Sequence, residues 1–175
     1  VMTKKNSVLK NLSTVCDLIY SKSPIVKNET IARRVLTGQG ARARRILAEL
    51  VIKQPNKKSF GIEGHGPEKS IYDAIFELTG LHRFEQKTKT WKFDFSFPKD
   101  ASWSGVKEQL SDFLTKAKSE RVGIQELADR LQAPPIGLKE GLINLLLVAL
   151  IHSRATTLLM YEHGSLIVEL DDAVV

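Results

Sequence analysis

Residues 138–152 constrain the fold of this chain more than any other stretch, because they are apolar on almost every face. Apart from Lys139, Glu140 and Asn144, nearly all of these residues are hydrophobic or small. A helix that is hydrophobic all round is covered by other elements. We therefore expect a buried helix that packs against the first half of the chain or against another part of a larger protein. The alternative is an exposed apolar strip that serves as a dimer or partner surface.

The remainder of the second half predicts two more helices and a hairpin. Apolar residues recur at helical spacing over about 106–117 and 124–131. Pro134, Pro135 and Gly137 supply a turn before the buried helix. Residues 162–165, with the sequence Glu-His-Gly-Ser, have turn chemistry between two apolar stretches at 156–161 and 166–170, and predict a β-hairpin. Three helices followed by a hairpin is the order of a winged-helix unit.

The first half predicts the same order with different residues. Helical spacing of apolar side chains predicts helices within 8–19, 28–36, 41–53 and 67–78. Residues 91–97 alternate aromatic with polar side chains, as a half-buried strand does, and form a hairpin with residues 83–85. Leu78 is expected on the buried face of the fourth helix. Cys16 is expected to fill the core beneath the first one.

Together these patterns predict a mainly α-helical α+β fold with small β-hairpins, built from tandem winged-helix (helix-turn-helix) units. The predicted boundaries are a unit at 1–98, a linker at 99–105 and a second unit at 106–175. The linker interrupts all periodicity and carries Pro98, Gly105 and two serines. Trp103 in this linker is expected to hold the two units together; a partner-facing tryptophan is the alternative.

Charge is distributed unevenly between the two predicted halves. The net charge is +6, but residues 1–98 hold 18 Lys and Arg against 9 Asp and Glu, whereas residues 99–175 hold 8 against 11. The first unit is therefore basic and the second leans acidic, and the hairpin of the second unit carries Glu162 and Glu169 instead of lysines. The two units face different partners, or only the first meets a polyanion.

Composition sets further limits. The 42% hydrophobic and 26% charged content are those of a globular protein. No apolar run reaches the roughly 18 residues that span a bilayer, and the single cysteine excludes an internal disulfide, so we expect a cytoplasmic protein without membrane contact. Val1 precedes Met2 and the chain stops abruptly at Val175, so we expect a piece of a longer protein.

Two stretches superficially resemble catalytic motifs, and we interpret neither as one. Residues 61–70 resemble a phosphate-binding loop, but Pro67 and Glu68 stand where that loop needs a lysine and free amides, which favours a loop that starts a helix. Asp73 with Glu85 and Lys87 has the order of a metal-dependent nuclease signature. Asp73, however, lies in a strongly periodic helix, and such sites place their acidic residues on neighbouring strands.

The histidines also give no sign of chemistry. Their spacing is not that of a zinc site, and each is expected at the surface or at a helix cap. We therefore expect no catalytic residue, no metal, no cofactor and no small-molecule substrate, so that the chain itself is not an enzyme. The four histidines are His65, His82, His152 and His163.

The basic side chains gather in two places where a winged helix meets DNA. Five arginines flank the turn at residues 37–40, and three lysines lie at or near the tip of the first hairpin. The alternative is an ordinary solvated face. The candidate nucleic-acid-binding residues are Arg33, Arg34, Arg42, Arg44, Arg45, Lys87, Lys89 and Lys92.

Several stretches resemble a known class of protein. They are residues 134–147, 159–166 and 169–170 in the second half, and residues 28–29, 33–34, 41–50, 61–64, 67–72 and 79–82 in the first. They are similar to the later region of very large bacterial P-loop ATPases found in phage-defence and DNA-modification islands, BREX-type systems among them. The resemblance implies a non-catalytic, winged-helix segment of a DNA-associated ATPase and carries over no catalytic residue.

Two functional hypotheses follow. The first is a module that binds double-stranded DNA without sequence preference through the basic helix-turn-helix and its wing. The second is a scaffold that couples a larger ATPase to other domains or partner subunits without touching DNA.

Overall fold

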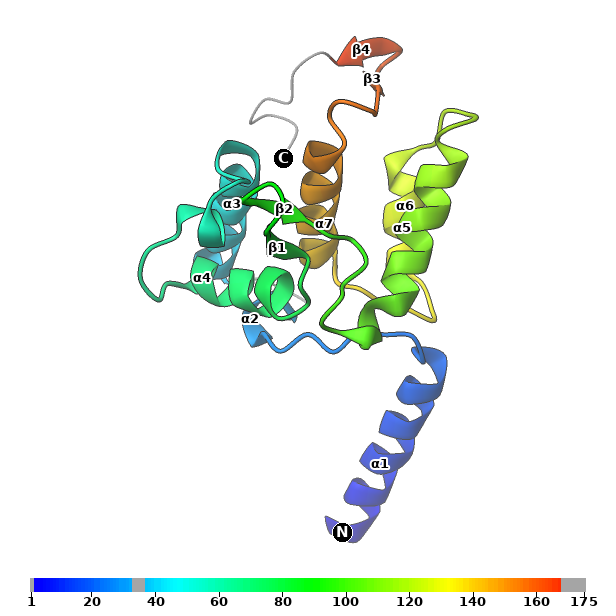
Figure 1. Cartoon of the computed structure of the whole chain (residues 1–175). Coiled ribbons are helices and arrows are strands. Elements are labelled where there is room, and N and C mark those ends of the chain that lie inside the picture. Colours follow the sequence, from blue (N-terminus) through cyan, green and yellow to red (C-terminus); the bar gives the residue numbers. More distant parts are fainter. Residues whose placement is uncertain (1, 33–36, 168–175) are drawn as a thin grey trace. The chain divides into compact units, whose positions relative to one another are not determined.

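The computed structural model describes residues 2–32 and 37–167, which are mainly helical with two small antiparallel β-hairpins (Figure 1). This confirms the α+β class. The helices are α1 (Met2–Ile19), α2 (Glu29–Ala32), α3 (Gly38–Lys53), α4 (Pro67–Tyr72), α5 (Ser104–Lys116), α6 (Ile124–Gln132) and α7 (Glu140–Ser153), with short turns η1 (Lys58–Gly61), η2 (Asp73–Glu77) and η3 (Ala101–Trp103). The strands are β1 (His82–Glu85), β2 (Thr90–Phe93), β3 (Met160–Glu162) and β4 (Ser165–Ile167). Among the described residues, no helix is both long and apolar enough to cross a membrane.

The chain forms two compact units that are interleaved in sequence. Unit 1 comprises Val1–Ile25 and Ser102–Leu138, and unit 2 comprises Val26–Ala101 and Lys139–Val175. These units do not follow the boundaries predicted at residues 98 and 106, because each takes residues from both halves of the sequence. The predicted linker is itself partly helical, since it contains η3 and the start of α5.

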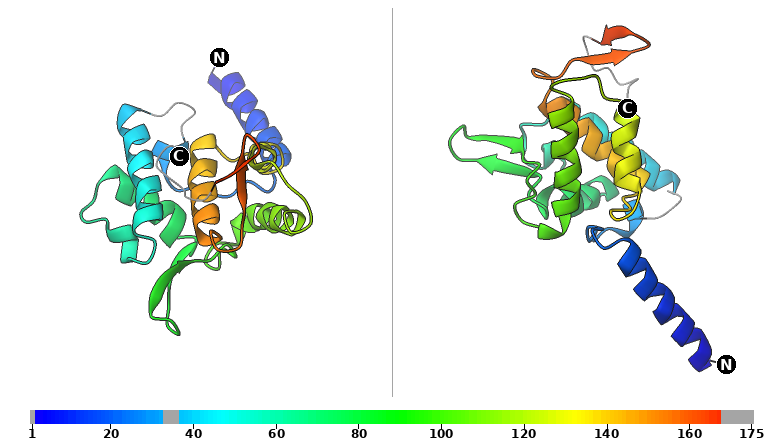
Figure 2. Two further views of the ribbon diagram at one scale, coloured as in Figure 1. Left: turned by 90° about the horizontal axis from the view of Figure 1, so that it is seen from above. Right: turned by 90° about the vertical axis from the view of Figure 1, so that its right-hand side faces the viewer.

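Helix α7 explains the interleaving. It packs against α3 and also contacts α2 and β2, all within unit 2 (Figure 2). Its leucines are almost fully covered; Leu145 and Leu146 are 0% exposed. The expected burial of this helix is therefore confirmed, and a helix of the first half supplies much of the cover. Removing several leucines from water at about 25 cal/mol per Å² makes this pairing a main source of stability in unit 2.

Aromatic rings fill the rest of the unit 2 core. Phe60, which is 0% exposed, meets Tyr72 edge-on with ring centroids 5.0 Å apart and Phe76 edge-on at 5.1 Å. Edge-to-face contacts of this kind suit the ring quadrupoles. Phe93 of β2 closes the cluster at 5.8 Å from Phe60. The hairpin is thereby attached to the helices by its aromatic face.

The prediction that Leu78 is buried is wrong. Its side chain is 54% exposed, whereas Phe76 is fully buried. The reason lies in η2, where the last part of the predicted helix is a π-helical turn. A π turn contains more residues than an α turn, so it rotates the side chains that follow it away from the face that the α period predicts.

In unit 1 the apolar stripe of α1 is exposed. Val8, Leu12 and Val15 are 65%, 57% and 48% exposed. The prediction that Cys16 fills a core is therefore wrong, since its side chain is exposed as well. The periodicity correctly identified the stripe, but periodicity does not show whether another element covers it.

The segment after α1 is tied to the rest of unit 1. The Lys22 amide donates to the Pro135 carbonyl at 3.0 Å, and the Lys22 ammonium lies 2.8 Å from the Glu108 carboxylate. Trp103 is 0% exposed within this unit, where η3 leads into α5. Helices α5 and α6 pack together, at positions close to those that the apolar spacing predicts.

Both hairpins form, and both are shorter than predicted. Strand β2 ends at Phe93, because Asp94 turns the chain by accepting a hydrogen bond on Oδ1 from the Ser96 amide at 3.0 Å. In the second hairpin, His163 and Gly164 have φ angles of 49° and 84°, as a tight two-residue hairpin turn requires. The predicted strand residues 168–170 lie outside the described residues.

Candidate functional site

The first turns of α3 carry three of the predicted arginines. Thr37 caps this helix, since its hydroxyl oxygen accepts a hydrogen bond from the Gly40 amide at 3.1 Å. The helix therefore begins at Gly38, earlier than the predicted start at Ala41. One face of the helix is buried, which leaves arginines on the remaining surface. The buried residues are Gly40, Ala43, Leu47, Ala48 and Val51.

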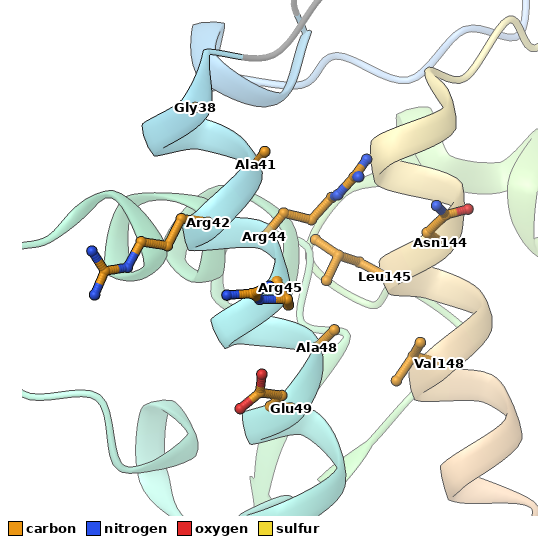
Figure 3. Close-up of a pocket in the computed structure, with 10 residues that line it drawn as sticks. All are labelled: Gly38, Ala41, Arg42, Arg44, Arg45, Ala48, Glu49, Asn144, Leu145 and Val148. Atoms are coloured by element: carbon orange, nitrogen blue, oxygen red, sulfur yellow. The ribbon is translucent and has the colours of Figure 1, made fainter. Parts of the chain in front are cut away.

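A groove of about 510 Å³ separates α3 from α7, and the arginines line it. Figure 3 shows Arg44 reaching from α3 toward α7, whereas Arg42 projects from the opposite side of α3. Arg44 is half-buried, and Arg42 and Arg45 are exposed. The lining residues are Gly38, Ala41, Arg42, Arg44, Arg45, Ala48 and Glu49 of α3, and Asn144, Leu145 and Val148 of α7.

Arg44 lies against the first turn of α7. A Cβ atom placed on Gly141 would lie only 2.8 Å from Nη1 of Arg44, so the glycine leaves room for the guanidinium beside the first turn of α7. That end of a helix carries a partial positive charge. A guanidinium beside that end is repelled by it, and an anion that binds between them offsets this repulsion.

None of the three guanidiniums forms an ion pair with a described carboxylate. The acidic residue of the groove, Glu49, instead has its carboxylate 3.7 Å from the ammonium of Lys53. Three guanidiniums on neighbouring turns of one helix, none of them ion-paired with a described carboxylate, produce a positive potential that attracts anions. The groove and its rim therefore favour phosphate or carboxylate groups.

The hairpin lysines differ from one another. Lys87 and Lys89 lie exposed in the turn between β1 and β2. Lys92 lies on β2 opposite Arg83 and forms an ion pair with Glu85, which lowers the pKa of that carboxyl. It is not at the tip of the hairpin, and its charge is largely neutralised. Two lysines thus remain available to an anion at the tip.

The structure does not bring the two basic clusters together. Lys87, Lys89 and Lys92 are absent from the groove lining. Figure 2 shows the hairpin projecting from the side of unit 2 that lies toward the C-terminal end of α3, away from the arginine-bearing first turns. Arg33 and Arg34 lie outside the described residues. The groove arginines and the hairpin tip are two separate basic places on unit 2.

The loop at residues 61–70 starts a helix, as predicted. Gly66 is the residue before α4, and Pro67 occupies its first position. The nuclease-like order is not assembled either, since Asp73 pairs with Lys69 and Glu85 pairs with Lys92. Among the described residues, no three His, Cys, Asp or Glu side chains are grouped as metal ligands would be.

The prediction that every histidine lies at the surface or at a cap is wrong for His82. This side chain is 1% exposed, with Nδ1 2.9 Å from the Tyr72 hydroxyl and Nε2 2.8 Å from the Pro55 carbonyl oxygen. Burial lowers its pKa to about 4, so the imidazole is neutral at pH 7. Its position next to buried Leu81 at the start of β1 is the signal that could have indicated burial.

In the sequence, Asn144 stands out only as a polar exception on an apolar helix, and no pattern singles out Glu49. Both line the groove, and only the pairing of α3 with α7 places them beside the arginines.

No protein-family model, curated protein or solved structure matches this chain significantly. Its function is therefore inferred from the groove and its surroundings.

Proposed function

We propose that this chain is a non-catalytic module that binds duplex DNA without sequence preference, through its phosphate backbone. The observation that carries the proposal is the set of three guanidiniums on the first turns of α3, none ion-paired with a described carboxylate. Arginine suits phosphate oxygens because its planar fork can donate two parallel hydrogen bonds. Lys87 and Lys89 at the hairpin tip supply a second contact.

The arrangement of α3 favours phosphate contacts over contacts to bases. The helix contacts both α4 and α7, and Ala43, Leu47 and Val51 are buried. Little of its surface is left to enter a major groove, where base edges are read. Arg42 and Arg45 are exposed and can reach phosphates without such an entry. Backbone contacts alone carry no sequence information.

We further propose that α2, α3 and the β1–β2 hairpin are the helix-turn-helix and wing of a winged-helix unit. Their order along the chain and the exposed lysines in the hairpin turn support this. The proposed context is a large ATPase of the phage-defence type, in which ATP hydrolysis belongs to other segments.

The test is fluorescence anisotropy of the full chain on labelled duplex DNA across a salt series. With about five cationic groups on phosphates, log affinity falls with log salt at a slope of about −4.5. The affinity for duplex DNA is then expected to drop roughly several hundred-fold between 50 and 200 mM salt. The double variant Arg42→Gln/Arg45→Gln removes two contacts, so we expect its slope to flatten by about 1.8.

A matched control removes the same charge elsewhere. Lys107 and Lys118 are exposed residues of unit 1, and the variant Lys107→Gln/Lys118→Gln is expected to keep the slope of the parent. Equal losses in both double variants would show that only net charge matters. Absence of duplex binding at 50 mM salt would overturn the DNA proposal.

In that case scaffolding is the better account. The observation that favours this second candidate is the exposure of Val8, Leu12 and Leu18 along α1. A scaffold of this kind would couple the larger ATPase to partner subunits. Its binding to those subunits would not change when the groove arginines are substituted.

A further inference from the structure

We propose that the β1–β2 hairpin binds single-stranded DNA, by stacking an unpaired base on the exposed ring of Phe84. The proposal rests on the proposed function only in that Lys87 and Lys89 contribute to both. It assigns to the hairpin a form of DNA other than the duplex that the α3 arginines would contact. The observation behind it is a row of aromatic rings that begins in the core of unit 2 and ends at an exposed ring near two exposed lysines.

The strand register places these rings on one face of the hairpin. Phe84 lies opposite Trp91 of β2, and His82 lies opposite Phe93. Side chains alternate along a strand, so the two pairs share a face. The inner pair belongs to the core, where the ring centroids of His82 and Phe60 are 4.3 Å apart. Trp91 follows at 5.1 Å from His82, and Phe84 lies 5.9 Å from Trp91, so the row runs outward along the hairpin.

The outer end of this row is open. His82 is buried, Trp91 is half-buried and Phe84 is 40% exposed. The contact with Trp91, at 61° between the ring planes, covers part of Phe84 and holds the ring in place. A flat ring that is held in place with part of its surface free can take a nucleobase, as the aromatic side chains of single-strand-binding proteins do.

The acidic residues of the hairpin are neutralised by their neighbours. Glu85 forms an ion pair with Lys92, and Asp94 forms one with Arg83, with the Arg83 Nε 2.7 Å from the Asp94 carboxylate. Neither carboxylate is therefore left to repel a phosphate. The charge that the hairpin presents to a ligand is that of the lysines in its turn.

Those lysines lie just beyond the exposed ring. Lys87 and Lys89 are exposed in the turn, and neither is ion-paired with a described carboxylate. Lys89 is two residues from Trp91, or about 7 Å along an extended backbone. A lysine side chain at that distance can contact the phosphate of a nucleotide whose base lies on Phe84. Positive charge beside an aromatic ring is the combination that binds single strands.

A single strand suits this ring better than a duplex does. Inside a duplex both faces of a base are covered by its neighbours, so a side chain reaches them only by unstacking a step, at a cost in free energy. Unpaired bases offer their faces without that cost. Every base has such a face, so the contact tolerates any sequence.

The experiment uses the full chain at 50 mM salt and two labelled twelve-nucleotide strands, measured by fluorescence anisotropy. One strand is oligothymidine, and the other has the same backbone without bases. Both carry the same phosphates, so purely electrostatic contact binds them alike. Stacking of one base predicts that oligothymidine binds about fivefold or more tightly than the abasic strand. Equal affinities would overturn the proposal, and this comparison does not depend on the folding of a variant.

A pair of variants tests the assignment to Phe84. Phe84→Leu removes the ring but keeps an apolar side chain and every charge. We expect it to weaken oligothymidine by about fivefold or more, and to leave the abasic strand and the duplex within about twofold of the parent. The matched control, Tyr161→Leu, removes a 43% exposed ring from the second hairpin and should leave all three affinities within about twofold. Equal losses in both variants would contradict a site at Phe84.

The duplex measurement separates this proposal from the proposed function. Loss of duplex binding, with oligothymidine still preferred over the abasic strand, would overturn the duplex proposal alone. Duplex binding with equal affinity for the two single strands would overturn the stacking site alone. If none of the three binds at 50 mM salt, both proposals fail, and a protein partner is the better account of the exposed ring.

Discussion

At His82, a backbone carbonyl and a phenol hold an imidazole in one protonation state. Nε2 donates to the Pro55 carbonyl oxygen, because a carbonyl can only accept, so the neutral ring accepts at Nδ1 from the Tyr72 hydroxyl. Burial raises the pKa of Tyr72, which keeps that hydroxyl protonated. The pair fixes the start of β1 to the aromatic cluster of unit 2.

This pairing predicts a pH dependence of stability. The pKa of His82 is lowered from 6.5 to about 4 on folding, so the unfolded chain binds more protons between these values. The stabilisation is complete above pH 6.5 and is lost as the pH falls toward 4. Between pH 7 and 5 we expect the free energy of unfolding to drop by about 2 kcal/mol in urea titrations.

The control uses a histidine in a different environment. His163 is exposed in the turn of the second hairpin, so His163→Gln should retain the pH dependence, whereas His82→Gln should flatten it. A free energy of unfolding that is the same at pH 7 and pH 5 in the parent chain would contradict the buried, neutral imidazole.

Among the elements of unit 2, α3 and α7 cover each other's apolar faces. Leu146 of α7 is 0% exposed, and Leu146→Ala leaves a cavity that the packed helices cannot fill. We expect a loss of about 2–5 kcal/mol in the free energy of unfolding, measured by denaturant titration. Leu12→Ala makes the same change at a side chain of α1 that is 57% exposed. That variant should stay within about 0.5 kcal/mol of the parent.

A comparable loss at both positions would contradict the exposure of α1 in the structure. No loss at Leu146 would contradict the burial of α7 in the unit 2 core.

Local pattern was enough to predict some elements and not others. The sequence predicts α5, α6, α7 and the turn at His163 well, because helical spacing and turn residues act within a few positions of the chain. It does not predict the exposure of Leu78, since a π turn changes the register without any marker residue. Nor does it show what covers an apolar stripe, as Cys16 illustrates.

The sequence predicts only part of the candidate site, because local patterns do not show which distant residues come together. The arginines of α3 stand out as a cluster, but Asn144 joins them through a contact between segments about 100 residues apart in the chain. No local rule specifies which distant helix an apolar face will meet. The neutralisation of Lys92 was equally hidden, because it depends on the register that places Glu85 near it.

On the scale of the whole molecule, the net charge is divided evenly between the two units, although it is divided unevenly between the two halves of the sequence. Counted by unit, unit 1 holds 9 Lys and Arg against 6 Asp and Glu, and unit 2 holds 17 against 14. Each unit is therefore basic by three charges, and the asymmetry between the halves disappears. What distinguishes unit 2 is the local concentration of arginine on α3, not its total charge.

The interleaving predicts how truncated chains behave. A fragment of residues 1–98 contains α3 without α7 and α1 without α5 or α6. Since neither unit is complete, we expect it to lack cooperative thermal unfolding, whereas the full chain shows a single or double cooperative transition by circular dichroism. A sharp transition in the 1–98 fragment would show that the first half folds by itself after all.

The same interleaving affects how the chain folds while it is being translated. When α3 emerges from the ribosome, the helix that covers it has not yet been made, because α7 begins at Glu140 and α3 ends at Lys53. From the end of α3 to the end of α7 at Ser153 the chain runs for 100 residues (153 minus 53), so at about 5–20 residues per second the delay is about 5–20 s. During that interval the nascent chain exposes the apolar side of α3 to solvent, and it is a candidate for chaperone capture until α7 has been made.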